Sequence, residues 1–221
     1  KRLGIDPDSR LGVLASECRK RGIRLIMHLN LAYISNQHEF FQETYGNPGS
    51  KRWDWFFFLN DTGTRYLGYA DDPSLPRLNT SSEGAATYLL DIVRNWAASG
   101  IDGFLFEHAD LLPSGWWLKV REAALGGSGK DDFLLAGSCH GSGDYVNQLF
   151  QGGKFTMAES LNHATELALA FAGERPEGIS VGLGNWEAAI PRGGAFLRPT
   201  ANREMPRLAS MYGDEMRSRA A

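Results

Sequence analysis

Short apolar segments and helical segments alternate along most of this chain, and the alternation restricts the folds open to it. The apolar segments are too short for helices and suit strands that are covered on both faces. Such alternation is typical of a parallel β-sheet flanked by helices. Strands are expected at residues 23–29, 101–106, 132–137 and 155–158, with a weaker one at 195–201. Helices are expected at residues 8–21, 85–96, 116–124, 145–150 and 161–172.

The clearest pattern lies between residues 80 and 108. Residues 80–83, Thr-Ser-Ser-Glu, fit a capping box, and apolar side chains then recur at helical spacing as far as Trp96. Gly100 stands where a helix can end, and a short buried strand is expected after it. Glu107 then falls at the carboxyl end of that strand, which in a parallel barrel faces the active site.

Composition and charge exclude several classes of protein. The 221 residues are 43% hydrophobic and 22% charged, which is ordinary for a globular chain and enough for one sizeable core. The formal net charge of -3 gives no indication of nucleic acid or of an acidic membrane as a partner. No apolar run approaches the roughly 18 residues of a membrane span. Cys18 and Cys139 are interpreted as free thiols, and nothing assigns the chain to a compartment.

Residues 103–107, Gly-Phe-Leu-Phe-Glu, carry a recognisable motif. They resemble the fourth barrel strand of the α-amylase family, glycoside hydrolase family 13, whose pattern is Gly-Phe-Arg-x-Asp. In that family the Asp is the nucleophile and the Arg lies beside it, whereas this chain has Glu107 and Leu105. The resemblance implies an α/β fold, a partial (β/α)8 TIM barrel with about strands three to seven. Barrel strands one, two and eight have no counterpart in the chain.

Residues 24–38 resemble the third strand of the family and the loop after it. The family has Asp at the position of His28, where it binds sugar hydroxyls. It has Asn-His where Ala32 and Tyr33 stand, the Asn helping to hold calcium and the His contacting the sugar. Ala32 offers no side-chain oxygen, and calcium needs several. We therefore expect no cofactor and no family calcium site, and we interpret His108 as a strand-end residue.

A loop-rich insert is expected after the third strand. Residues 38–42, 50–56 and 75–79 resemble the small domain B of neopullulanases and cyclomaltodextrinases. The predicted insert spans residues 34–79. It separates a barrel part at 1–33 from a second barrel part at 80–221. Its aromatic cluster at residues 53–58 is interpreted mainly as a small satellite core, with a sugar-stacking platform as the alternative.

Two further motifs hold the remaining catalytic positions of the family. Residues 132–138 resemble the fifth strand, where the general acid Glu follows a Gly; here Ser138 stands there, and a hydroxyl has no proton to give near neutral pH. Residues 202–210 resemble the seventh-strand motif Asn-His-Asp-x-x-Arg, with Arg203 and Glu204 replacing the His and the Asp that stabilises the transition state. Residues 185–187, Asn-Trp-Glu, are a rival alignment that lacks the same continuation.

These replacements predict an α-amylase-like barrel without amylase catalysis, because retaining glycosidases need two carboxylates about 5–5.5 Å apart. Such a pseudoenzyme would bind an α-glucan or maltooligosaccharide, or act through protein contacts. The alternative is an active α-glucan hydrolase or transglycosylase that uses Glu107 and Glu204, with an acid such as Glu159 as the donor. A third possibility is a structural fragment without sugar binding. An incomplete sheet has open edges, so a protein partner or self-association that completes the barrel is also expected.

Overall fold

The computed structural model describes residues 10–140, 143–161 and 190–197, and the isolated residues 184, 187, 188 and 210. The chain forms two compact units, Lys1–Leu134 and Leu135–Ala221. In the described ranges, no helix is long and apolar enough to cross a membrane. The helix expected at 161–172 lies outside these ranges apart from its first residue. The predicted three-part division at residues 33 and 79 stays a prediction.

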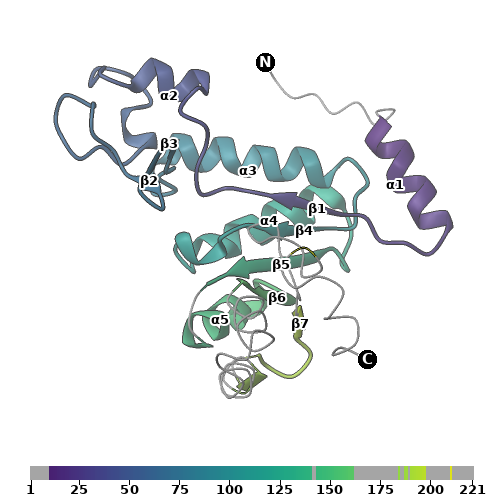
Figure 1. Cartoon of the computed structure of the whole chain (residues 1–221). Coiled ribbons are helices and arrows are strands. Elements are labelled where there is room, and N and C mark those ends of the chain that lie inside the picture. Colours follow the sequence, from purple (N-terminus) through teal and green to yellow (C-terminus); the bar gives the residue numbers. More distant parts are fainter. Residues whose placement is uncertain are drawn as a thin grey trace. The chain divides into compact units, whose positions relative to one another are not determined.

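The first unit contains a parallel strand pair with its connecting helix (Figure 1). In β1–β4, Ile26 is paired with Gly103 and Leu29 with Phe106. Because the chain passes through α3 between them, the pair forms a βαβ unit, as the alternation predicts. Its helices are α1 (Arg10–Lys20), α2 (Glu39–Thr44), α3 (Glu83–Ala97) and α4 (Trp116–Ser128), with short 3-10 turns at Trp53–Trp55 and Ala109–Leu111. Its strands are β1 (Ile26–Leu29), β2 (Gly68–Tyr69), β3 (Asp72–Pro76) and β4 (Gly103–Phe106).

The second unit contains three strands that pair in parallel, β5 with β6 and β6 with β7. They are β5 (Leu134–Cys139), whose first residue closes the first unit, β6 (Met157–Ser160) and β7 (Ala195–Leu197). Helix α5 (Gly143–Phe150) and a 3-10 turn at Gln151–Gly153 lie between β5 and β6. Strand β6 begins two residues later than predicted. The predicted parallel arrangement is confirmed for every strand pair named here.

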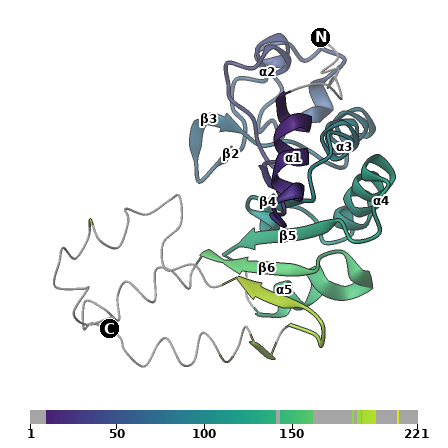
Figure 2. The same ribbon diagram turned by 90° about the vertical axis from the view of Figure 1, so that its right-hand side faces the viewer.

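The core of the first unit lies where β4 meets its helices. Phe104 and Phe106 are fully buried, and the ring of Phe106 lies 5.1 Å from that of Trp117 on α4. Val93 on α3 is also fully buried, and Figure 2 shows α3 and α4 side by side. Burying each large apolar side chain stabilises a fold by about 1.5–3 kcal/mol. This packing fixes the direction of β4 and so the position of Glu107 directly after it.

Helix α3 begins two residues later than the capping box predicts. Ser82 is the N-cap, and its hydroxyl accepts a hydrogen bond from the Ala85 amide at 3.4 Å. Glu83 is therefore the first helical residue, too early to reach back to the cap as a capping box requires. The capping-box prediction is wrong, although the helix itself is confirmed.

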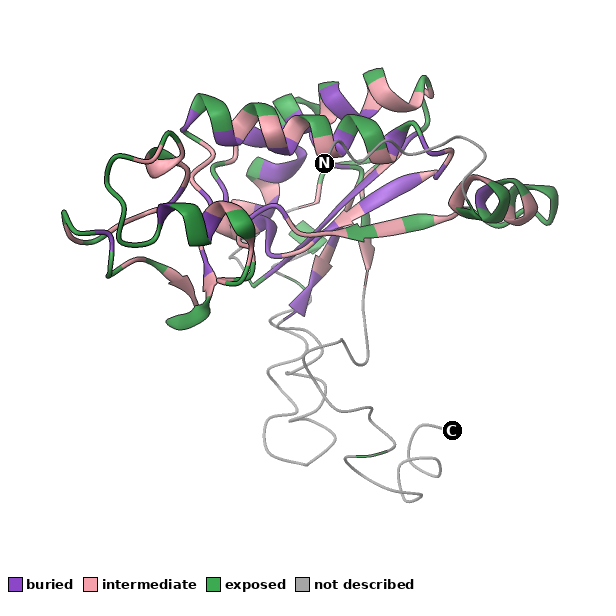
Figure 3. Cartoon of the chain, turned by 90° about the horizontal axis from the view of Figure 1, so that it is seen from above, coloured by how far each residue is buried: buried purple, intermediate pink, exposed green. Residues whose placement is uncertain are grey.

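Helix α1 is confirmed, and its apolar face is only partly buried. Leu11, Leu14, Ala15 and Cys18 share one face by their helical spacing. Of its residues only Ala15 is buried, whereas Leu14 is 50% exposed. Figure 3 shows the helix as mostly exposed or intermediate. A helical period in the sequence marks an apolar face without identifying what covers it.

The loop-rich segment after β1 has a small core of its own. Phe41 on α2 is 1% exposed, and its ring lies 5.0 Å from that of Phe56 and 4.7 Å from that of Tyr66. Single bridges join Phe56 to Leu78 and Phe58 to Tyr66. The segment is therefore held by aromatic packing with very little regular structure, which is why no period is visible in its sequence.

Candidate functional site

Three of the residues predicted for the site meet at the end of β4. The Glu107 amide donates to the carbonyl of Leu29 at 3.0 Å, which continues the β1–β4 ladder by one residue. On its side chain, Oε1 lies 3.1 Å from Nδ1 of His28, and Oε2 accepts a 3.4 Å hydrogen bond from the hydroxyl of Tyr33. The Glu107 side chain is 17% exposed, so few water molecules compete with these two side chains for hydrogen bonds to the carboxylate. The contact with His28 is an ion pair whenever the imidazole is protonated.

Leu105, at the position of the family arginine, lies directly opposite His28 in the β1–β4 register. Paired residues in a parallel sheet point to the same face, so His28 occupies the place beside Leu105. Where the family has an arginine on β4 next to its nucleophile, this chain has an imidazole from the neighbouring strand next to Glu107. The group beside the carboxylate therefore differs from the family's arginine in both its strand and its chemistry.

Two residues that the sequence reasoning did not assign to the site also lie there. The ring of Tyr69 stacks on that of Tyr33 at 4.7 Å with an angle of 15° between the planes. The hydroxyl of Tyr69 lies 3.4 Å from Nδ1 of His108, which is 2% exposed. His108 therefore belongs to the surroundings of Glu107 and is more than the strand-end residue expected from the sequence.

The β2–β3 hairpin carries Tyr69 to this position. Its turn residues Ala70 and Asp71 have φ angles of 49° and 59°. A two-residue hairpin turn of type I′ requires positive φ angles at both central positions. Gly, Asn and Asp are favoured at such positions, so Ala70 gives no turn signal in the sequence. His108 also has a positive φ, 45°, which turns the chain immediately after Glu107.

The remaining predicted positions lie apart from this cluster in the sequence. Ser138 is the fifth residue of β5, is fully buried, and is paired in register with Glu159 on β6. Arg203 and Glu204, the seventh-strand positions, lie outside the described residues, as do Asn185 and Trp186 of the rival motif. Their roles stay predictions.

The described residues contain no group of three or more His, Cys, Asp or Glu side chains arranged to hold a metal ion. Ala32 is buried, and its carbonyl accepts a hydrogen bond from the Leu78 amide at 2.8 Å. Its side chain is a methyl group and cannot serve as a calcium ligand. The expected absence of the family calcium site stays a prediction.

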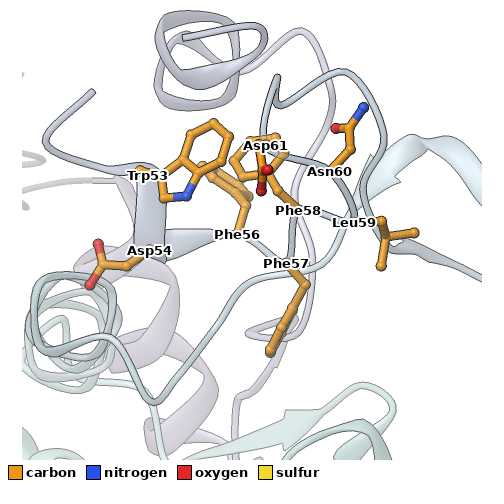
Figure 4. Close-up of a pocket in the computed structure, with 8 residues that line it drawn as sticks. All are labelled: Trp53, Asp54, Phe56, Phe57, Phe58, Leu59, Asn60 and Asp61. Atoms are coloured by element: carbon orange, nitrogen blue, oxygen red, sulfur yellow. The ribbon is translucent and has the colours of Figure 1, made fainter. Parts of the chain in front are cut away.

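The aromatic cluster of the insert borders an open pocket, shown in Figure 4. One face of the Trp53 indole is covered by Phe58, whose ring stacks on it at 4.1 Å. Gly63 lies against the same indole so closely that an added Cβ would be 2.5 Å from it. The indole packs against both Phe58 and Gly63, which fits the satellite core expected here, and the sugar-stacking alternative stays a prediction.

Comparison with known proteins links the sequence to one enzyme family. Residues 8–114 match the family described as alpha amylase, catalytic domain. Over those residues the chain is similar to the α-amylase family. Neopullulanase 2 of Thermoactinomyces vulgaris is 28% identical over 115 residues, covering 49% of this chain and 20% of that protein. Alpha-amylase MalA of Haloarcula japonica is 24% identical over 205 residues, 91% of this chain and 29% of that protein.

Solved structures share the fold of this chain. A cyclomaltodextrinase structure has a TM-score of 0.76 and 23% identity, covering 93% of this chain and 36% of that one. An α-amylase from H. orenii has a TM-score of 0.74 and 19% identity, covering 96% of this chain and 50% of that one. The predicted partial TIM barrel is thereby confirmed, as is the likeness to neopullulanases and cyclomaltodextrinases. The chain spans about a fifth to a third of the lengths of the curated relatives named above.

Proposed function

We propose that this domain binds α-glucan at Glu107 and does not hydrolyse it by the α-amylase route, which makes it a pseudoenzyme. The observation that carries the proposal is the serine near the carboxyl end of β5, at the position of the general acid in the family. General acid catalysis contributes roughly 10²–10⁴-fold, and a hydroxyl does not provide it near neutral pH. Leu105 and Glu107 also replace the supporting arginine and the nucleophilic aspartate, and a displacement of about 1 Å alone can cost roughly 100-fold.

The surroundings of Glu107 support sugar binding. Ligand sites combine apolar and aromatic walls with a few polar groups that fix the orientation of the ligand. Here Tyr33 and Tyr69 supply aromatic surface, and Glu107, His28 and His108 supply polar groups beside it. A structural neighbour, the cyclic maltosyl-maltose hydrolase of Arthrobacter globiformis, has been solved in complex with maltose.

The insert at residues 34–79 is proposed as the counterpart of domain B. Its β2–β3 hairpin brings Tyr69 onto Tyr33, so the insert contributes directly to the wall of the proposed sugar site. We expect Tyr69→Ala to weaken maltotriose binding several-fold in calorimetry, because aromatic stacking on a ligand contributes about 0.5–1.5 kcal/mol beyond area burial. Tyr45→Ala is a suitable control, since Tyr45 is an exposed aromatic residue elsewhere in the insert.

The test of the main proposal combines maltotriose binding with release of reducing ends. The parent chain is expected to bind maltotriose without measurable turnover, and Glu107→Gln is expected to weaken binding. Failure of the parent to bind maltotriose, maltoheptaose or cyclodextrin would support a structural fragment and contradict the proposal.

A gain-of-function series tests the missing groups directly. Neither Glu107→Asp nor Ser138→Glu alone is expected to yield turnover, because each leaves other parts of the catalytic unit absent. The triple change Leu105→Arg, Glu107→Asp, Ser138→Glu supplies all three groups. We expect it to need His28→Asp as well, since His28 now occupies the place beside position 105 and contacts residue 107.

Hydrolysis or transglycosylation through Glu107 and Glu204 is the second candidate. The observation in its favour is that His28 and Tyr33 both contact the Glu107 carboxylate, so two donors stand in for the missing arginine. Clear turnover by the parent chain that Glu107→Gln abolishes would establish this candidate over the first.

A further inference from the structure

A polar pocket lies at the amino-terminal ends of β1 and β4 in the first unit. Its volume is about 500 Å³, within the range of ordinary ligand sites. Asp102, in its wall, precedes β4, whereas Glu107 follows β4. The pocket is therefore at the opposite end of the strand, roughly 16 Å from the proposed sugar site at about 3.3 Å per residue. Its charged lining residues are Arg19, Arg24, Asp102, Lys130 and Asp132.

Cationic side chains outnumber carboxylates in this lining. Three of the charged residues are Arg or Lys and two are Asp, which leaves an excess of one positive charge. The Nζ of Lys130 donates to Asp102 at 2.7 Å and to the carbonyls of Gly100 and Ile101 at 3.2 and 2.7 Å. These three bonds use all three hydrogens of the ammonium group. Lys130 is thus committed to the fold, and the arginines carry the excess charge.

Both arginines have donor groups that face solvent. Within the described residues, Arg19 bonds only through Nη2, to the Gly100 carbonyl at 2.8 Å and to Asp102 at 3.2 Å. Arg24 likewise bonds only through Nη2, to Asp132 at 3.0 Å. The two arginine side chains are 55% and 59% exposed. Their Nε and Nη1 groups are therefore accessible to a ligand from solution.

We propose that this pocket binds a phosphate group through Arg19 and Arg24. A guanidinium presents its donors in a planar fork that matches the oxygens of a phosphate. A phosphate offers three or more oxygens to donors that approach from two segments of the chain, whereas a carboxylate offers two. Ile23, which is 54% exposed, lines the same pocket and gives apolar surface for the rest of an organic phosphate. The site does not depend on the proposed glucan binding.

Asp132 is the group that a phosphate displaces from Arg24. Both members of the Arg24–Asp132 pair are exposed, and exposed ion pairs contribute little stability. Arg24 therefore exchanges this carboxylate for a more highly charged ligand at small cost. Removal of the Asp132 charge is expected to tighten phosphate binding, whereas a purely structural ion cluster would bind no phosphate with or without that charge.

Calorimetry with sodium phosphate on the full chain tests the site, at constant ionic strength set with chloride. The parent is expected to bind phosphate saturably, and Arg24→Gln to weaken the binding about ten- to hundredfold through loss of charge-assisted hydrogen bonds. Asp132→Asn is expected to tighten it up to about fivefold. Arg21→Gln is the charge-matched control, because Arg21 pairs with Glu17 on α1 and does not line the pocket.

Two further probes identify the source of the phosphate group. Glucose 6-phosphate that displaces phosphate and binds more tightly supports an organic phosphate packed on Ile23, and equal affinities support free phosphate. Maltotriose is expected to leave phosphate binding unchanged, because Glu107 lies at the other end of β4.

Three outcomes would overturn the proposal. The first is a parent chain that binds no phosphate at millimolar concentrations, whatever its affinity for maltotriose. The second is equal binding by the Arg24→Gln and Arg21→Gln variants, which would show attraction to overall charge and not to this pocket. The third is displacement of phosphate by maltotriose, which would place the phosphate at Glu107.

Discussion

At the residue scale, Asp102 joins three segments of the first unit at the start of β4. Its Oδ1 accepts hydrogen bonds from Lys130 at 2.7 Å and Arg19 at 3.2 Å, and its Oδ2 accepts one from the Leu25 amide at 3.0 Å. Partial burial alone would raise the pKa of Asp102, but these bonds outweigh it and hold the pKa below its usual value. A carboxyl with a lowered pKa stabilises the fold above its unfolded pKa of about 3.9. That contribution is lost as the pH falls through the folded pKa.

Asp102→Asn is therefore expected to lower the free energy of unfolding at pH 7 by about 1–3 kcal/mol. The deficit relative to the parent should shrink as the pH falls below about 4, where the carboxyl takes up a proton first in the unfolded chain and only at lower pH in the folded one. Urea unfolding at several pH values from 7 to 3 measures it. Asp91→Asn serves as the control, because the exposed Asp91–Arg94 pair contributes little. A deficit that stays constant with pH would show that Asp102 acts by shape and not by charge.

At the element scale, two adjacent glycines in α4 make opposite predictions. A Cβ on Gly127 would lie 2.4 Å from the carbonyl oxygen of Arg94, where α4 passes closely over the end of α3. A Cβ on Gly126 would meet nothing within 4 Å. We expect Gly127→Ala to destabilise the chain by about 1–3 kcal/mol, because the helices must move apart. Gly126→Ala should stabilise it by about 0.5–1 kcal/mol through helix propensity. Thermal unfolding of both variants measures this, and equal effects would exclude the close helix contact.

At the scale of the whole molecule, the first unit presents an apolar edge. In the described residues β1 pairs only with β4, and Ile23 and Ile26 beside that edge are 54% and 36% exposed. Exposed strand edges pair with other chains unless they are blocked. We therefore predict that the chain self-associates or binds a protein along β1. Light scattering during size exclusion should show oligomers that Ile26→Lys reduces. Leu118→Lys, at a similarly exposed position on α4, should not reduce them. A monodisperse parent monomer would contradict the prediction.

Local pattern was enough to establish the parallel α/β architecture and most of the described elements. Residues 101–106 are apolar apart from Asp102 and Gly103 and too few for a helix, and the helical period through Trp96 is long enough to exclude a strand. The same local reasoning placed Glu107 at a strand end, where the structure has it. Boundaries were less accurate, as Ser82 and β6 show, because caps and pairing partners decide where an element starts.

Tertiary structure alone decided which side chains surround Glu107. His28 and Glu107 are far apart in the sequence, and only the β1–β4 register brings them to 3.1 Å. Tyr69 reaches the site through a hairpin turn whose first central residue, Ala70, gives no turn signal in the sequence. Ser138 and Glu159 became neighbours by strand pairing in the same way. The physical reason is that strand and helix periods act over a few residues, whereas register and packing depend on the whole set of contacts that the folded chain makes.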